Sequence, residues 1–371
     1  MASPVEPTSR RLSGAEAQPA TLTYSNCPVP NALLTALSSG ILREHGIALD
    51  ILSGRQGTVH FTYDQPAYTR FGGEIPPLVS EGLRAPGRTR LLGITPVLGR
   101  AGYYVRADSP IREPADLAGR RVGVSASATR ILRRELGNYL ELDPWRQTLV
   151  ALGAWEARAL LHTLAAGGLT VDDVELVRIE SPGVDLPPER LQAASSLRGA
   201  DLFPDVAGQQ AAILEQDRAE ALFAWLPWAA ELETRSGARP VLDLGLDARN
   251  AYASVWTVSS ELVERQPEVV QRLVDAAVEA GWWAQQHGDA VTALHADNLG
   301  VSADAIRKGF GAEFHQNLLP RLDTDAIALL ERTQQFLLDH KLLLQPVPLD
   351  AWAAPEFLNN SLQRQSARKI A

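Results

Sequence analysis

A regular alternation of strand-like and helix-like segments constrains the fold of this chain most. Residues Thr21–Tyr24 are short and β-prone, Ala32–Ser38 are helical in character, and Ile47–Leu52 are again apolar. Strand, helix and strand in this order are typical of a parallel βαβ unit. A helix near Pro76–Leu83 and a strand over Arg90–Thr95 complete one half of an α/β fold.

A second unit with the same alternation follows along the chain. Gly102–Arg106 is extended and leads to a short helix that ends at Gly119, because glycine is common just past a helix end. A strand over Val122–Val124 and a helix that begins near Ser125 come next, and Trp155–Ala166 forms an amphipathic helix. Further strands are expected over Val174–Ile179 and Ala221–Ala224.

The last third of the chain returns to the first half and then becomes helical. Tyr252–Val258 has the pattern of a returning strand, and helices are expected over Pro267–Gln286, Asp289–Leu299, Ala303–Phe310 and Thr324–His340. Two α/β halves joined by two extended crossings indicate the two-domain fold of type II periplasmic binding proteins, with ligands in the inter-domain cleft. We expect a disordered leader over 1–20, a first domain over 21–105 and 251–371, and a second domain over 106–250.

Composition excludes several classes of partner. With 371 residues, 45% of them hydrophobic and 21% charged, the chain is long enough for two globular domains. A net charge of −9 without a basic run argues against nucleic acid. The first 19 residues lack the apolar stretch of a secretory signal, and no window is apolar enough for a membrane span. We therefore expect a cytoplasmic protein without a membrane partner.

The chain contains a single cysteine, Cys27, which excludes an intramolecular disulfide and any multi-cysteine metal site. Such a residue is either an inert packing group or a reactive thiol. It lies between the first strand and the first helix, where Pro28 and Pro30 suit a helix start. Ligands bind at this end of a strand, and a helix N-terminus favours a thiolate, so the position favours a functional role.

A polar and aromatic segment over Ser53–Gly73 has little periodicity and is expected to form a loop at the same edge of the sheet. His60 can exchange a proton near neutral pH, and Arg70 can hold a sulfinate or carboxylate by a bidentate pair. The glycine pair that ends at Gly73 offers backbone N–H groups to an anion. Taken singly, His60 could be a surface histidine and Arg70 a solvated charge. Together with Cys27 they form a candidate site.

Aromatic residues of the second half could line a ligand pocket. Trp155 is the best candidate, and Trp225 and Trp228 also fall near expected loop-to-helix junctions. The proline-containing stretch Ser181–Pro204 has weak periodicity, as expected of a long surface loop that could act as a lid.

Three long motifs identify a family resemblance. Tyr24–Leu34, Gly57–Pro77 and Glu356–Ser361 resemble the corresponding segments of 2′-hydroxybiphenyl-2-sulfinate desulfinases, which catalyse the last step of bacterial dibenzothiophene desulfurisation. The resemblance extends from about Thr21 to Ser361.

The resemblance implies a monomeric hydrolase that releases sulfite from an aromatic sulfinate by C–S bond cleavage, without a metal or organic cofactor. It assigns the nucleophile to Cys27, the assisting histidine to His60, the sulfinate-holding arginine to Arg70, and an N–H contact to Gly73. All four residues are present here.

Because a biphenyl is apolar, an aromatic wall must supply much of its affinity, and Trp155, Phe61 and Phe203 are candidates for it. We expect segments Gln56–Tyr63 and Pro182–Pro204 to become ordered when substrate binds. Two other functions are compatible with this fold. One is a binding protein that delivers sulfonates to a transporter, and the other is a pyrimidine-synthase-like enzyme, which would need a histidine-rich iron site that the sequence does not show.

Overall fold

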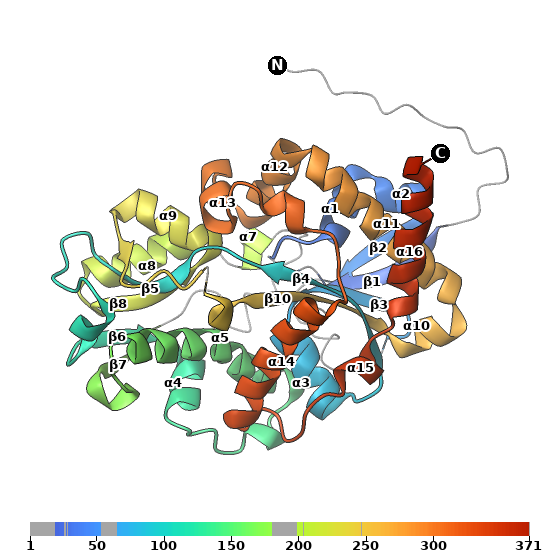
Figure 1. Cartoon of the computed structure of the whole chain (residues 1–371). Coiled ribbons are helices and arrows are strands. Elements are labelled where there is room, and N and C mark those ends of the chain that lie inside the picture. Colours follow the sequence, from blue (N-terminus) through green and yellow to red (C-terminus); the bar gives the residue numbers. More distant parts are fainter. Residues whose placement is uncertain are drawn as a thin grey trace.

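The computed structural model describes residues 19–25, 27, 29–52, 65–179, 199–202, 204–245 and 247–370. Within these ranges the chain forms two mixed sheets with helices on their faces, so the expected α/β class is confirmed (Figure 1). The expected leader lies outside the described residues as far as residue 18.

The first sheet has the strand order β2-β1-β3-β10-β4 in the described part of the chain. β1 pairs in parallel with β2 and β3, whereas β10 is antiparallel to both β3 and β4. Its strands are β1 (Ala20–Ser25), β2 (Ile47–Leu52), β3 (Tyr68–Gly73), β4 (Thr89–Val97) and β10 (Tyr252–Ser259).

The second sheet has the order β7-β6-β8-β5-β9. β6 is parallel to β7 and β8, and β5 is antiparallel to β8 and β9. Its strands are β5 (Ala101–Val105), β6 (Arg121–Val124), β7 (Glu175–Arg178), β8 (Ala221–Trp225) and β9 (Arg239–Pro240). The domain boundaries stay predictions, but β5, which falls within the predicted first domain, hydrogen-bonds within the second sheet.

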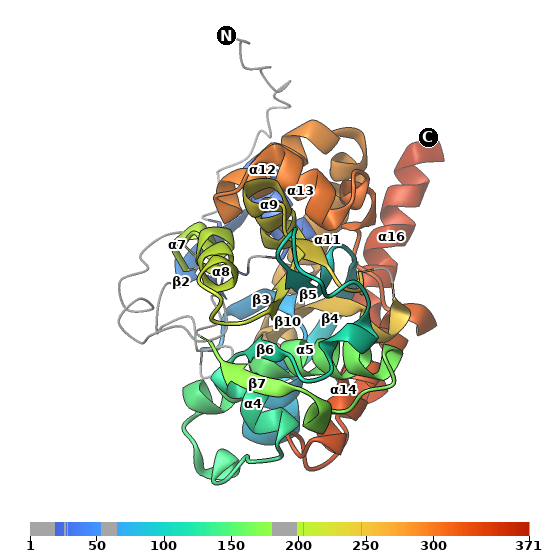
Figure 2. The same cartoon turned by 90° about the vertical axis from the view of Figure 1, so that its left-hand side faces the viewer.

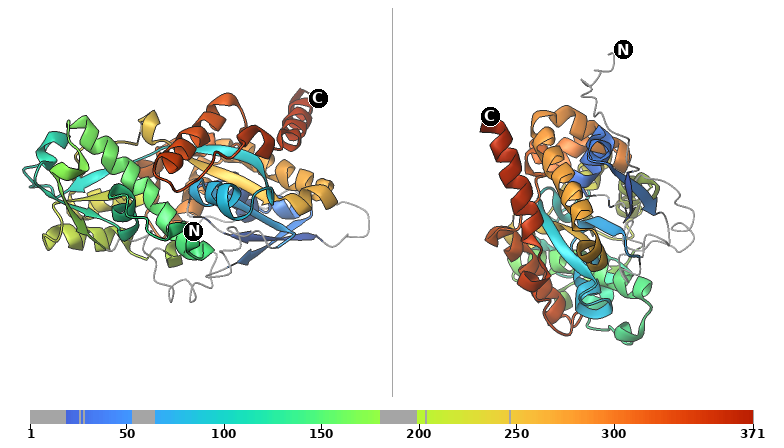
Figure 3. Two further views of the ribbon diagram at one scale, coloured as in Figure 1. Left: turned by 90° about the horizontal axis from the view of Figure 1, so that it is seen from below. Right: turned by 90° about the vertical axis from the view of Figure 1, so that its right-hand side faces the viewer.

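Helices cover both faces of each sheet. We call each sheet together with the helices that cover it a lobe. In the view along the second lobe, α8 and α9 lie on one side of its sheet and α4 and α5 on the other (Figure 2). α16 packs on α11 at the far end of the first lobe (Figure 3, right). The helices are α1 (Ala32–Ser39), α2 (Ile41–Glu44), α3 (Ile75–Val79), α4 (Ala126–Leu132), α5 (Pro144–Ala166), α7 (Gly199–Leu202), α8 (Val206–Glu215), α9 (Leu226–Ser236), α10 (Ser260–Arg265), α11 (Pro267–Gln286), α12 (Gly288–Leu299), α13 (Ala303–Phe310), α14 (Thr324–Asp339), α15 (Leu349–Trp352) and α16 (Pro355–Ile370). None of the helices in these ranges is long and apolar enough to cross a lipid bilayer.

The expected loop over Ser53–Gly73 is wrong at its C-terminal end, because residues Tyr68–Gly73 form the central strand β3. All six are buried, since β1 and β10 flank the strand and both of its faces are covered. A strand buried on both faces has no alternation of polar and apolar residues, so the sequence pattern did not reveal it. On one face, Phe71 stacks on Trp256 of β10 with ring centroids 5.3 Å apart.

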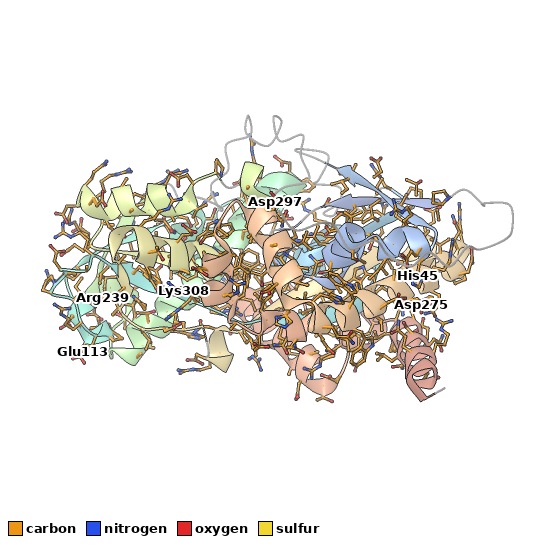
Figure 4. All side chains as sticks on the ribbon, turned by 90° about the horizontal axis from the view of Figure 1, so that it is seen from above. His45, Glu113, Arg239, Asp275, Asp297 and Lys308 are labelled. Carbon is orange, nitrogen blue, oxygen red and sulfur yellow. The ribbon has the colours of Figure 1, made fainter. Side chains whose placement is uncertain are left out.

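Packing of α13 on α9 joins the two lobes in addition to the two chain crossings. The N–H and hydroxyl of Ser302, at the start of α13, donate to Glu231 of α9 at 3.0 and 2.8 Å. The Arg100 N–H donates to the Gly309 carbonyl at 2.8 Å, and a Cβ on Gly309 would lie 2.5 Å from Cα of Pro227. Lys308 of α13 accordingly lies toward the end of the molecule that carries Arg239, away from His45 (Figure 4). The lobes are therefore packed against each other along α9 and α13.

Candidate functional site

Cys27 lies between β1 and α1, just beyond the C-terminal end of the first strand. Its side chain is buried, with 7% exposed. Asn31, which is fully buried, caps α1 by accepting the Leu34 N–H at 2.9 Å. The Asn31 amide also donates to the carbonyls of Val29 at 3.0 Å and of Phe71 at 3.3 Å. Asn31 thus ties the cysteine segment to the neighbouring strand β3.

The structure brings Arg70 and Gly73 of β3 against the cysteine sulfur. The Gly73 N–H donates to Sγ of Cys27 at 3.4 Å, and Nη2 of Arg70 lies 4.0 Å from the same sulfur. Nη1 of Arg70 donates to the Gly73 carbonyl at 3.0 Å, so the guanidinium is oriented by the peptide next to it. Arg70 is only 5% exposed, and hydrogen bonds from a buried cation to an anion are strong. We call the thiol, the guanidinium and this N–H the sulfur cage.

Gly72 has a steric role at this site that the sequence analysis missed. A Cβ at this position would lie 2.4 Å from Cβ and 2.5 Å from Sγ of Cys27, and 3.0 Å from Nη2 of Arg70. The thiol can approach the Gly73 N–H only because residue 72 has no side chain. The Gly-Gly pair in the sequence is the signal for this role, because the pair provides a position without a side chain as well as N–H groups.

Aromatic rings close the cage on the side of the second lobe. A Cβ on Gly73 would lie 2.7 Å from the Trp155 ring, so the indole rests directly on the Gly73 backbone. Trp155 packs on Trp225 with centroids 5.2 Å apart and contacts the edge of the Tyr252 ring at 6.0 Å. Trp225 also packs on Trp228 at 6.1 Å. Tyr252 was expected only as a strand residue and is an additional member of this aromatic cluster.

Several predicted site residues lie outside the described part of the chain. These are His60, Phe61 and Phe203, together with segment Gln56–Tyr63 and most of Pro182–Pro204. Their proposed roles stay predictions. Among the described residues, no three histidine, cysteine, aspartate or glutamate side chains are grouped so that they could hold a metal ion.

Burial shifts three titratable groups around the cage. It raises the pKa of the Tyr24 hydroxyl, which the nearby Cys27 raises further and Arg70 lowers. Burial also raises the pKa of Glu74, against the opposing effect of Arg158. It raises the pKa of Tyr252 to about 12, again opposed by Arg158. The two tyrosine hydroxyls therefore stay protonated near neutral pH. The cage can present its donors to an oxyanion beside the thiol.

Comparison with known proteins gives close relatives. The chain is 74% identical over 344 residues to 2′-hydroxybiphenyl-2-sulfinate desulfinases of Rhodococcus erythropolis and Rhodococcus qingshengii, which covers 93% of this chain and 94% of theirs. The crystal structure of the desulfurization enzyme DSZB is also 74% identical, with a TM-score of 0.88 over 93% of this chain and 99% of that one. The structure of its C27S mutant in complex with biphenyl-2-sulfinic acid matches with a TM-score of 0.90 and the same coverage.

More distant similarities concern the fold alone. The periplasmic sulfonate-binding protein SsuA of Methylobacillus flagellatus is 13% identical, with a TM-score of 0.66 over 94% of this chain and 96% of that one. The sequence pattern of the family described as NMT1/THI5 like matches residues 99–195. The expected binding-protein-like architecture is thereby confirmed.

Proposed function

Because this chain belongs to the family of 2′-hydroxybiphenyl-2-sulfinate desulfinases, we propose that it hydrolyses 2′-hydroxybiphenyl-2-sulfinate to 2-hydroxybiphenyl and sulfite. The reaction would be the last step of dibenzothiophene desulfurisation. The observation that carries the proposal is the sulfur cage, in which one thiol, one guanidinium and one N–H converge within 4.0 Å in a chain with a single cysteine.

The chemistry of the cage fits an arylsulfinate. A sulfinate carries one negative charge over two oxygens, and a planar guanidinium can donate to both. The Gly73 N–H adds a fixed donor that needs no rearrangement during the reaction. DSZB with the substitution C27S is the form seen in complex with biphenyl-2-sulfinic acid, and the only cysteine of this chain has the same number.

In one route the Cys27 thiolate attacks the sulfinate sulfur and the carbon–sulfur bond breaks. An aryl carbanion is a very poor leaving group, so the ring carbon must take a proton as the bond breaks, and His60 is the candidate donor. Water then hydrolyses the cysteine-bound sulfonyl group, which releases sulfite and restores the thiol.

In the other route the Cys27 thiol itself protonates the ring carbon, and sulfur dioxide leaves. Hydration of sulfur dioxide gives sulfite and returns a proton to the thiolate. Arg70 and the Gly73 N–H hold the sulfinate oxygens in both routes. Only the first route forms a sulfonyl adduct on Cys27, so mass spectrometry of acid-quenched protein distinguishes them.

The aromatic cluster suits the biphenyl part of the substrate. Trp155 lies on the Gly73 backbone, beside the donor that would hold the sulfinate. Each Å² of apolar surface removed from water contributes about 25 cal/mol, so two rings against such a wall contribute several kcal/mol of affinity. Phe61 and Phe203 would extend the wall from the two segments expected to order around the substrate.

We further propose that the protein works in the cytoplasm as a monomer without a cofactor. The cofactor-free part of this proposal is supported by Cys27, Arg70 and the Gly73 N–H, which already supply the thiol and the anion donors that both routes need.

The proposal is tested by incubating purified protein with 2′-hydroxybiphenyl-2-sulfinate and measuring sulfite and 2-hydroxybiphenyl. We expect the two products in equal amounts, loss of turnover after alkylation of the thiol, and loss of nearly all turnover in Cys27→Ser. Full activity of Cys27→Ser would refute both routes. Binding of the sulfinate without release of sulfite would instead support a binding protein.

A further inference from the structure

We propose that Glu74, Arg158 and Thr333 are positioning residues for the sulfur cage, because their buried cluster fixes the Gly73 N–H and the Trp155 ring relative to each other. Only the expected loss of turnover rests on the proposed function; the expected change in thiol alkylation does not. None of the three was singled out by the sequence analysis.

Glu74 follows Gly73 directly and anchors that end of β3. Its side chain is fully buried, and one carboxylate oxygen accepts the hydroxyl of Thr333 at 2.7 Å. The other accepts the backbone N–H of Ala253 in β10. Movement of the Gly73 peptide would therefore have to break hydrogen bonds of a buried carboxylate, which is costly in a low-dielectric interior.

Arg158 connects the same carboxylate to the Trp155 turn of α5. Its guanidinium lies 3.7 Å from Glu74, donates to Thr333 at 2.9 Å, and covers the Tyr252 ring at 4.6 Å from the centroid. The Tyr252 hydroxyl in turn donates to the Trp155 carbonyl at 3.3 Å. Trp155 and Arg158 are one helical turn apart, so the cluster holds that turn at both ends.

The cluster spans the elements whose relative position defines the site. Glu74 belongs to the first lobe, whereas α5 extends from the second lobe toward α3 and α14 of the first (Figure 3, left). A buried ion pair adds little to stability compared with apolar residues of the same volume, so its presence behind the cage calls for another reason. Orientation of the anion donor against the aromatic wall provides that reason.

The test uses alkylation of Cys27, the single thiol, by iodoacetate and by iodoacetamide. The ratio of the two rate constants reports the attraction of the cage for an anion, and the thiolate fraction cancels from it. We expect Glu74→Gln and Thr333→Val each to lower this ratio about tenfold and kcat/KM for sulfite release by about 10²-fold, as expected for misplacement by about 1 Å.

Glu81→Gln is a matched control. Glu81 is also buried and accepts a backbone N–H, from Gly87 at 2.7 Å, and a threonine hydroxyl, from Thr89 at 2.8 Å. The variant Glu81→Gln should lose about as much thermal stability as Glu74→Gln does, without a change in the alkylation ratio or kcat/KM. Thr333→Val keeps the side-chain volume and serves if Glu74→Gln fails to fold.

A purely structural cluster would lower the melting temperature of all three variants and leave the ratio unchanged, which would overturn the proposal. An equal loss of the ratio in Glu81→Gln would also overturn it. Absence of sulfite release from the wild-type protein would refute the proposed function, while the alkylation ratio would still decide the positioning role.

Discussion

Replacement of Gly72 by alanine is the most direct test of the cysteine geometry. The new Cβ would lie 2.4 Å from Cβ of Cys27, whereas nonbonded carbons are stable at about 3.5–4.0 Å. The cysteine segment would have to move by about 1 Å or more. Because misplacement of a reacting group by about 1 Å can reduce the rate by about 10²-fold, the barrier should rise by about 2.7 kcal/mol.

The assay is kcat/KM for sulfite release, with the melting temperature measured on the same samples. Gly119→Ala is the control, because Gly119 has a φ of +70°, and its Cβ would meet nothing within 4 Å. That variant should lose about 1 kcal/mol of stability through its backbone conformation and keep its activity. If Gly72→Ala retained more than a third of the wild-type kcat/KM, close approach of the thiol to β3 would not be needed for the reaction.

Three further predictions concern groups around the cage and one remote histidine. Arg70→Lys keeps the charge but replaces the planar fork, whose Nη1 is held by the Gly73 carbonyl, with a single ammonium nitrogen that cannot grip both sulfinate oxygens side by side, so KM should rise at least about tenfold, and an unchanged KM would count against a bidentate grip. Asn31→Ala removes the link to β3 and the α1 cap, and should cost about 1–2 kcal/mol in urea unfolding together with a lower alkylation rate of the thiol. Burial lowers the pKa of His295 to about 3 from 6.5, so the unfolded chain binds a proton that the folded one excludes. Stability should therefore be complete above about pH 6.5 and fall by up to about 1.4 kcal/mol per pH unit as the pH drops toward 3, and His295→Leu should flatten this dependence of the melting temperature.

The sequence predicted those parts of the fold that local pattern determines. The alternation over β1, α1 and β2 was expected, as was the return strand β10, and Pro267–Gln286 is the helix that its spacing indicated. The junction that holds Cys27 was also found at the end of the first strand. These features follow from periodicity and from turn residues, which act over a few positions.

Other parts of the fold and site depend on contacts between distant segments. β3 has no alternation because both faces are covered, so Arg70 was expected in a loop rather than in the central strand. Glu74 and Arg158 lie 84 positions apart in the numbering, and no local pattern connects them. The steric role of Gly72 likewise depends on where a different loop places its cysteine.

The packing of α13 on α9 has a thermodynamic consequence for the whole molecule. Glu231 of one lobe accepts hydrogen bonds from the N–H and the hydroxyl of Ser302 in the other. Unfolding of either lobe would therefore expose the surface of the other lobe that packs against it. We expect heat to remove both sheets in one cooperative transition, with calorimetric and circular-dichroism midpoints that coincide. A destabilising substitution far from the thiol would then lower the population of active protein as effectively as one beside it.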